Sequence, residues 1–254
     1  MRPYSLLGTR VRNGLTIVAV SGLALAALGL AAQDAPKAGS AGSASDLAAA
    51  AEDIVKNIDS KAADDEIARK GYTLALVANA VAEADGEAKW KAAALGVRDT
   101  AITLAKGAKS QATVDKALKE ITAAIETGKG AEGKPMKYLE IAPLEQVMKE
   151  VNDRNRPMTK NLRGTQFARS KEQVTRDAHV WAVLASAART DTKSAELAKK
   201  PQDDFDKYAN EFFNSSRSLA AAAKKGDQNA ASEALKSARK ACADCHSVYR
   251  PDIE

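Results

Sequence analysis

The chain of 254 residues is 45% hydrophobic, 28% charged and only 4% aromatic. These proportions exclude an intrinsically disordered chain and a membrane protein with many spanning segments. Alanine is abundant in nearly every segment, and it is the best helix former, whereas strands prefer β-branched and aromatic residues. No long segment alternates apolar and polar residues between turn signals. The composition therefore predicts an all-helical protein.

The N-terminal segment has the pattern of an export signal. Three arginines precede an uncharged run at residues 14–32, and a polar stretch follows. This order predicts a signal peptide over residues 1–31, with cleavage after Ala31. The run is long enough that an uncleaved membrane anchor is the alternative. In either case we expect the rest of the chain outside the cytoplasm, most simply in a bacterial periplasm.

The net charge of +5 comes largely from these arginines. Residues 1–31 contain three arginines and no acid, so the rest of the chain carries 35 basic and 33 acidic residues. Basic and acidic residues alternate along the predicted helices. The sequence therefore lacks the basic stripe expected of a nucleic-acid-binding protein.

The remaining chain divides into a linker and two groups of helices. Residues 32–44, rich in Gly, Ala and Ser, are interpreted as a flexible linker. The stretch GKGAEGKP at residues 128–135 separates the two groups. We predict one bundle over residues 45–133 and a second over residues 134–254. Their helices are expected near 45–61, 64–84, 87–108, 112–127, 143–163, 171–190, 202–225 and 228–250.

Local signals support these boundaries. Ser170, Asp203 and Asp227 are predicted caps near helix starts. Pro251 is expected to end the last helix, and Pro157 to kink or interrupt the fifth.

The two groups resemble each other at offsets that increase along the chain. Residues 54–61 match 147–154 at an offset of 93, and residues 68–80 match 175–187 at an offset of 107. The offset reaches 117 in the last pair of helices. The increases fall between helices, as loop insertions would place them. This pattern predicts two tandem antiparallel four-helix bundles related by duplication; chance similarity between alanine-rich helices is the alternative.

The stretch ACADCHSVYR, at residues 241–250, contains both cysteines of the chain and one of its two histidines. In a helix, Cys242 lies three residues from Cys245 and four from His246, so the three side chains share one side. Two such thiols can bind the two vinyl groups of one haem while the imidazole reaches the iron. C-x-x-C-H is the signature of c-type haem attachment.

Other interpretations of the cysteines fit less well. A thioredoxin-like dithiol belongs at the start of a helix in a βαβ unit. A zinc site needs four ligands, and His179 would have to supply the fourth. A disulfide between cysteines three apart in a helix has poor geometry.

The sequence CADCHSVYR, at the end of the last predicted helix, resembles the class II cytochromes c, the cytochrome c′ family. In that family C-x-x-C-H, followed by Tyr or Phe and Arg, closes an antiparallel four-helix bundle. The resemblance covers residues 143 to about 251. It implies that Cys242 and Cys245 form the thioethers to one haem c and that His246 is the proximal iron ligand. It also places Arg250 near the haem edge.

The first group of helices departs from the family pattern. The offset of 117 places Ile125 where the second group has Cys242, and no cysteine or histidine precedes His179. The first bundle is therefore expected to hold no covalent haem.

The sixth coordination position of the iron decides the chemistry. In the family a side chain from the first helix of the haem-binding bundle covers the distal face of the haem, and in low-spin relatives that side chain is a methionine. Met148 stands at that position, and packing in the core is its alternative role. His179 and Met158 are weaker candidates. Open-site members often carry an arginine four positions earlier, where this chain has Leu144.

The sequence therefore predicts a periplasmic c-type cytochrome, not an enzyme, that binds one covalent haem c and passes electrons to redox partner proteins. A gas-binding or sensing haem protein with an open sixth position is the alternative. A third hypothesis makes the first bundle an interaction module for the redox partner. Dimerisation is common in the family, and the sequence leaves it open.

Overall fold

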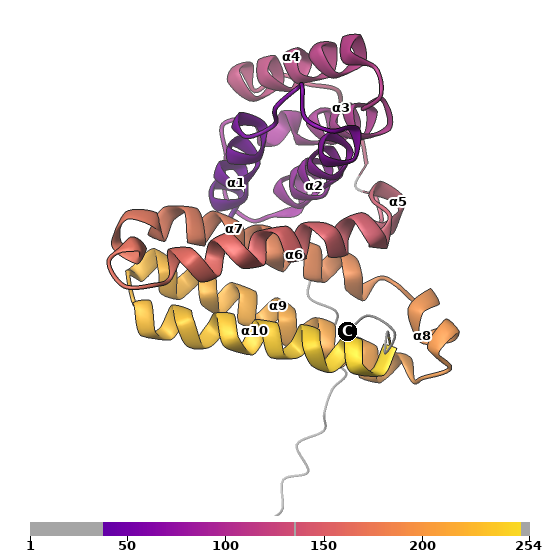
Figure 1. Cartoon of the computed structure of the whole chain (residues 1–254). Coiled ribbons are helices and arrows are strands. Elements are labelled where there is room, and N and C mark those ends of the chain that lie inside the picture. The colour runs from indigo at the N-terminus through magenta and orange to yellow at the C-terminus, as the bar shows by residue number, and fades with distance from the viewer. Residues whose placement is uncertain (1–37, 135, 250–254) are drawn as a thin grey trace, which may run out of the picture. The chain divides into compact units, whose positions relative to one another are not determined.

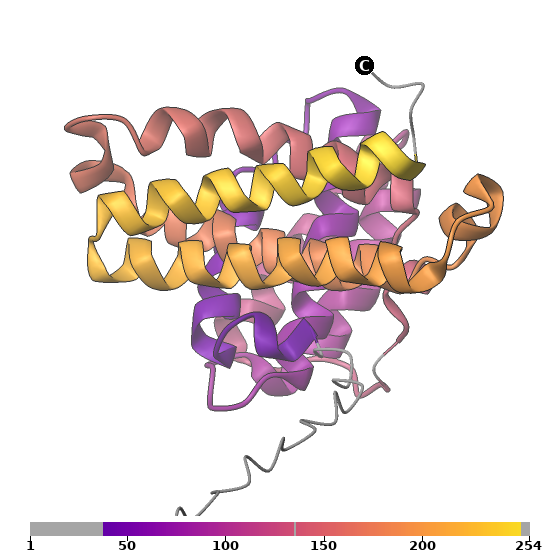
Figure 2. The same ribbon diagram turned by 90° about the horizontal axis from the view of Figure 1, so that it is seen from below.

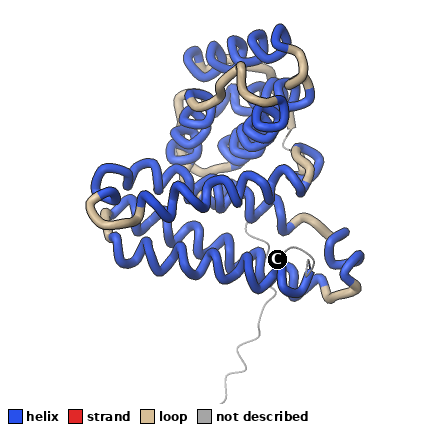
Figure 3. Tube along the Cα trace, in the orientation of Figure 1, coloured by secondary structure: helices blue, strands red, loops and turns tan. Residues whose placement is uncertain are grey.

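The computed structural model describes residues 38–134 and 136–249. These residues form helices joined by turns and contain no strand (Figure 3), which confirms the all-α prediction. The predicted leader, Arg250 and Pro251 lie outside the described residues. No helix within them is long and apolar enough to span a bilayer.

The first group of helices surrounds its own part of the core. Helix α1 packs on α2, α2 on α3 and α3 on α4, and α4 returns to contact α1 (Figure 1). The short 3-10 helix η2 leads into α3. The helices are α1 (Ala44–Lys56), α2 (Asp64–Glu83), η2 (Lys91–Ala93), α3 (Ala94–Lys106) and α4 (Gln111–Thr127).

The second group consists of four long helices and two short ones. Helix α7 packs between α6 and α9, and α9 lies side by side with α10 (Figure 2). By contrast, α6 and α10, the first and last long helices, make little direct contact within the described residues. The helices are α5 (Tyr138–Ile141), α6 (Leu144–Asn161), α7 (Gln166–Arg189), α8 (Lys193–Ala198), α9 (Gln202–Lys225) and α10 (Gln228–Tyr249).

Several predicted boundaries differ from the structure. Helix α1 ends at Lys56 because the Asn57 side chain donates to a backbone carbonyl of the last turn, at 2.8 Å. Ser170 lies inside α7 and caps nothing, whereas the Asp227 carboxylate accepts from the Ala230 amide at 3.0 Å and caps α10 as predicted. Asp203 lies in the first turn of α9. Helix α6 continues through Pro157, which is exposed, so water can reach the carbonyl that loses its partner.

The end of the predicted linker is part of the folded structure rather than flexible. Residues Ala38–Ala41 form the 3-10 helix η1, which packs on α2 and α7, and Ala41 is 1% exposed. The Ala41 carbonyl lies 2.8 Å from Nδ1 of His179. A Cβ on Gly42 would lie 2.7 Å from that same nitrogen. Small residues are thus needed here because the chain runs directly against α7.

The two groups share one continuous apolar core, and charged side chains are buried where α2 meets α6. Arg154 of α6 pairs with Glu150 at 2.7 Å and also with Asp177 of α7. Arg69 of α2 pairs with Glu150 at 3.3 Å and with Asp153 at 2.7 Å. The side chains of Arg154, Glu150 and Asp177 are 14%, 6% and 6% exposed. The first group is therefore joined to α6 through Arg69, whose pair with Glu150 is largely shielded from water, whereas the side chain of Asp153 is 49% exposed.

The same network extends to α1. Asp53 accepts from Gln173 at 3.0 Å and pairs with Arg176 at 3.3 Å, both on α7. Gln173 also donates to Asp177 at 3.3 Å. Burial raises the pKa of the Asp177 carboxyl, and the charge of Arg154 opposes that rise.

Arg154→Met is expected to lower the free energy of unfolding by about 3 kcal/mol, because it leaves buried carboxylates without the cation they share. Urea denaturation followed by circular dichroism measures the change. Arg156→Met is the matched control: Arg156 is exposed and has no ion pair within the described residues, so it should change stability by less than about 0.5 kcal/mol. Equal effects of the two substitutions would show that the buried network does not contribute as argued.

Candidate functional site

A mostly apolar cavity of about 70 Å³ lies between α6, α9 and α10. Its wall contains the C-x-x-C-H residues of α10 on one side and Met148 of α6 on the other. The other lining residues are Leu144, Val151, Ala188, Ser194, Phe205, Tyr208, Ala209, Phe212, Ala241 and Tyr249.

Helix α10 turns the two cysteines and the histidine toward this cavity. Cys242, Cys245 and His246 are each partly buried, and both cysteines are free thiols. Burial raises the pKa of Cys242 to about 12, with the neighbouring Cys245 adding to the effect, and raises that of Cys245 to about 11. Both thiols are thus protonated at neutral pH, unlike the low-pKa thiols of catalytic dithiols.

Tyr249 anchors the end of α10. Its hydroxyl donates to the Pro201 carbonyl at 2.6 Å, and its ring packs edge-on against Phe205, with 5.2 Å between centroids. Since Tyr249 is one helical turn beyond Cys245, these contacts fix the direction in which the C-x-x-C-H side chains point.

Helix α6 contributes the opposite wall. Leu144, Met148 and Val151 follow the i, i+4, i+7 spacing of one helix face, and all three line the cavity. The indole Nε1 of Trp181 donates to the Val151 carbonyl at 3.1 Å, so α7 holds α6 at this level. Met148 therefore faces the C-x-x-C-H residues from across the cavity.

A second hollow, of about 290 Å³, adjoins the first and shares Met148, Val151, Cys242 and His246 with it. Its wall is more polar, because it adds Asn152, Asn155, Trp181, Arg239 and Ala243. We call the two hollows together the α6–α10 groove. One end of the groove is apolar and the other carries amides and a guanidinium.

These residues fit a haem c. Two thiols three residues apart suit its two vinyl groups, and the imidazole and thioether on opposite walls are both iron ligands found in c-type cytochromes. The apolar end suits the porphyrin ring and the polar end suits its propionates. The cavity of about 70 Å³ is continuous with the hollow of about 290 Å³, and a separation of α6 from α10 would widen the groove for a porphyrin. That movement breaks few contacts, because these two helices pack loosely on each other.

The other predicted site residues lie elsewhere. His179 lines a separate hollow with Asp46 and Lys224; its Nε2 is 4.0 Å from Asp46, and burial lowers its pKa, so it is neutral at pH 7. His179 therefore cannot complete a zinc site with the cysteines. Met158 is fully buried in the core and does not line the groove, and Arg250 lies outside the described residues.

The structure also brings in residues that the sequence interpretation missed. Arg239, Asn152 and Asn155 form the polar end of the groove. Helical spacing could have found them, because Arg239 is three residues before Cys242, and Asn152 and Asn155 are four and seven residues after Met148.

The first group has a hollow at the corresponding place. Val55 and Ile125, which the repeat aligns with Met148 and Cys242, line one hollow of about 510 Å³. Its other lining residues are Glu52, Lys56, Lys89, Thr122 and Glu126, so it contains no thiol and no imidazole. In each group, therefore, a residue of the first helix and a residue of the last helix line the same hollow: Val55 with Ile125, and Met148 with Cys242.

Comparison with known proteins agrees with this geometry. Residues 141–250 match the family model of cytochrome c′. No curated protein and no solved structure gives a significant match to the chain. The matched segment contains all the residues of the α6–α10 groove. The C-terminal half of this chain is therefore similar to the cytochrome c′ family, and this similarity implies that it binds haem c.

Proposed function

We propose that the protein is an exported electron carrier with one covalent haem c, which Cys242, Cys245, His246 and Met148 would hold. The observation that carries this proposal is the position of Met148, which faces Cys242, Cys245 and His246 across one apolar cavity. A thioether paired with an imidazole is the ligand set of electron-transferring cytochromes c, whereas an open position favours binding of gases or peroxide.

The residues divide the work. The haem supplies an iron that accepts and releases one electron. Cys242 and Cys245 would hold the ring on α10, His246 would bind the iron from the same helix, and Met148 would raise the reduction potential as a ligand. Phe205 and Phe212 line the cavity and keep water from it, which also tunes the potential.

The proposed cellular role follows from the leader-like N-terminus. An arginine-containing start and an uncharged run support export, and a periplasm is the compartment in which such a cytochrome would meet redox partner proteins. We propose that the chain is a carrier without enzymatic activity of its own. The first group contributes no haem, because its equivalent hollow contains neither cysteine nor histidine.

The mass of the denatured holoprotein should equal that of the polypeptide plus one haem. Two cysteines supply the two thioether bonds of a single haem, and the chain has no others. Cys242→Ala and Cys245→Ala should each leave at most one thioether and a less stable holoprotein. Zero or two haems per chain would refute the assignment.

Met148→Ala should convert the ferric iron from low spin to high spin and lower the reduction potential, because the iron loses its sixth ligand. Absorption spectra in both oxidation states and redox titration measure these changes. Met136→Ala is the matched control, since Met136 lies on the segment between the two groups and outside the groove. If the Met148 variant keeps the wild-type spectrum while the wild-type protein binds carbon monoxide readily, the gas-binding alternative replaces electron transfer.

A further inference from the structure

A basic hollow of about 460 Å³ lies beside the α6–α10 groove. It is lined by Asn155, Arg156, Thr159, Lys160, Arg163 and Arg239, and contains no carboxylate. Arg156, Thr159 and Lys160 lie on one stripe of α6, because their spacing is i, i+3 and i+4, and Arg163 follows just after the end of the helix. Arg239 joins them from α10. We call this surface the basic surface.

The charges of the basic surface are uncompensated. Arg156, Lys160, Arg163 and Arg239 are all exposed, and none forms an ion pair with any described residue. Three acids near these residues in sequence are already engaged: Asp153 pairs with Arg69, Glu233 with Lys236, and Asp244 with Lys240. A chain of almost balanced charge thus has a local positive excess at this place.

The basic surface is continuous with the proposed redox site. Asn155 and Arg239 line both the basic hollow and the α6–α10 groove, where Met148, Cys242 and His246 lie. An anionic surface that docks here is therefore brought to the haem edge. Positive charge around a site speeds the association of an anionic partner and orients it, more than it adds affinity.

We propose that the basic surface is the docking site for a carboxylate-rich face of the redox partner protein. This inference rests on the proposed electron-carrier function. It differs from the expectation that the first group is the interaction module, since the residues concerned lie on α6 and α10.

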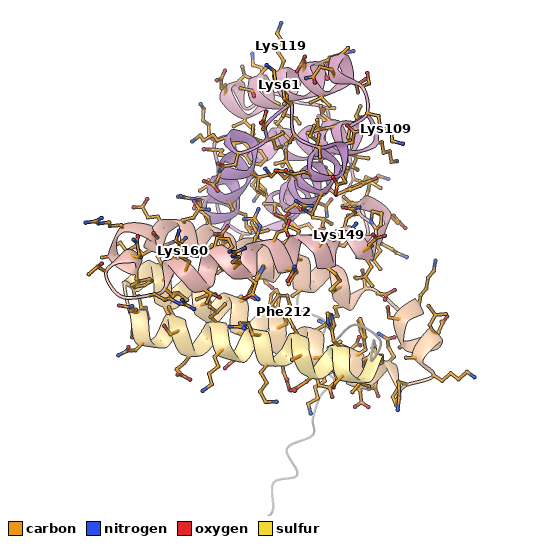
Figure 4. The ribbon with its side chains drawn as sticks, viewed as in Figure 1. Lys61, Lys109, Lys119, Lys149, Lys160 and Phe212 are labelled. Atoms are coloured by element: carbon orange, nitrogen blue, oxygen red, sulfur yellow. The ribbon has the colours of Figure 1, made fainter. Side chains whose placement is uncertain are left out.

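The test compares two charge-reversed forms of the full-length holoprotein. One carries Arg156→Glu and Lys160→Glu, which lie outside the α6–α10 groove. The control carries Lys109→Glu and Lys119→Glu, which make the same charge change on the first group, away from Lys160 of the basic surface (Figure 4). Two probes are used: oxidation of the ferrous protein by ferricyanide over a range of ionic strength, and calorimetric binding of a polyglutamate peptide.

The first form should lose about tenfold or more of the ferricyanide rate at low ionic strength, lose most of its salt dependence, and bind polyglutamate weakly. The control should stay near wild type in both measurements. Equal losses in the two forms would overturn the proposal. Displacement of polyglutamate by inorganic phosphate at equal charge would also overturn it, because that result would indicate a small-anion site.

The peptide measurement does not depend on redox activity, so a failure of the electron-carrier function is distinguishable from a failure of the docking surface.

A second inference comes from the buried charge network. Glu150 lies two residues after Met148, which places the two side chains on nearly opposite faces of α6. Arg69 of the first group contacts Glu150 at 3.3 Å and Asp153 at 2.7 Å. We infer that Arg69 is a positioning residue for the proposed distal ligand, because it fixes the rotation of the helix that carries Met148.

Arg69→Met should raise the high-spin fraction of the ferric protein several-fold and shift the reduction potential toward that of Met148→Ala, at temperatures where the variant is fully folded. Arg69→Lys should restore part of both values. Lys70→Met is the control, because Lys70 pairs with Glu66 within α2 and does not pair with α6. A loss of stability with unchanged spin state and potential would overturn the inference. If Met148→Ala itself changes nothing, the proposed ligation fails independently of Arg69.

Discussion

The arrangement of the whole chain depends on the two opposite faces of α6. One face carries Glu150 and Arg154, which are buried against α2 and α7 and paired there. The other carries Met148 and Val151, which line the α6–α10 groove. A buried charge without its partner costs several kcal/mol, so the ion pairs tolerate little rotation of the helix. The position of the groove wall is thus determined by contacts on the far side of α6.

This constraint explains why the groove lies between α6 and α10. Helix α6 is held by α2 and α7, and its Val151 carbonyl is bonded to Trp181. Helix α10 is held along its length by α9 and at its end by the Tyr249 hydroxyl. Neither helix depends on the other, so the space between them is where a large planar ligand disturbs the fewest contacts. Contacts in the second group are thus dense within the pairs α6–α7 and α9–α10 and sparse between α6 and α10.

The sequence predicted what local rules govern. Alanine-rich periodic segments and polar breaks located the eight long helices of the described residues, and the cysteine spacing indicated a candidate attachment site. The resemblance and the repeat together pointed to Met148. The ion pairs from Arg69 to Glu150 and from Gln173 to Asp53 could not be predicted, because they join residues far apart in the chain. The basic surface was also missed. Basic and acidic residues alternate along the sequence of α6, but in a helix residues three or four apart share a face, so the basic residues come together.

The two groups place different side chains around corresponding hollows. In both, the first and last helices face each other across a hollow, lined by Val55 and Ile125 in one and by Met148 and Cys242 in the other. In the first group Glu52, on the wall of that hollow, accepts from the Trp90 indole at 3.2 Å and so serves the packing of its own core. In the second group thiols, an imidazole and a thioether meet at the same place. Similar helix pairs can thus present different chemistry, because the function of a site depends on the few side chains that line it, and the first group contacts the second through Arg69 of α2 and Glu150 of α6.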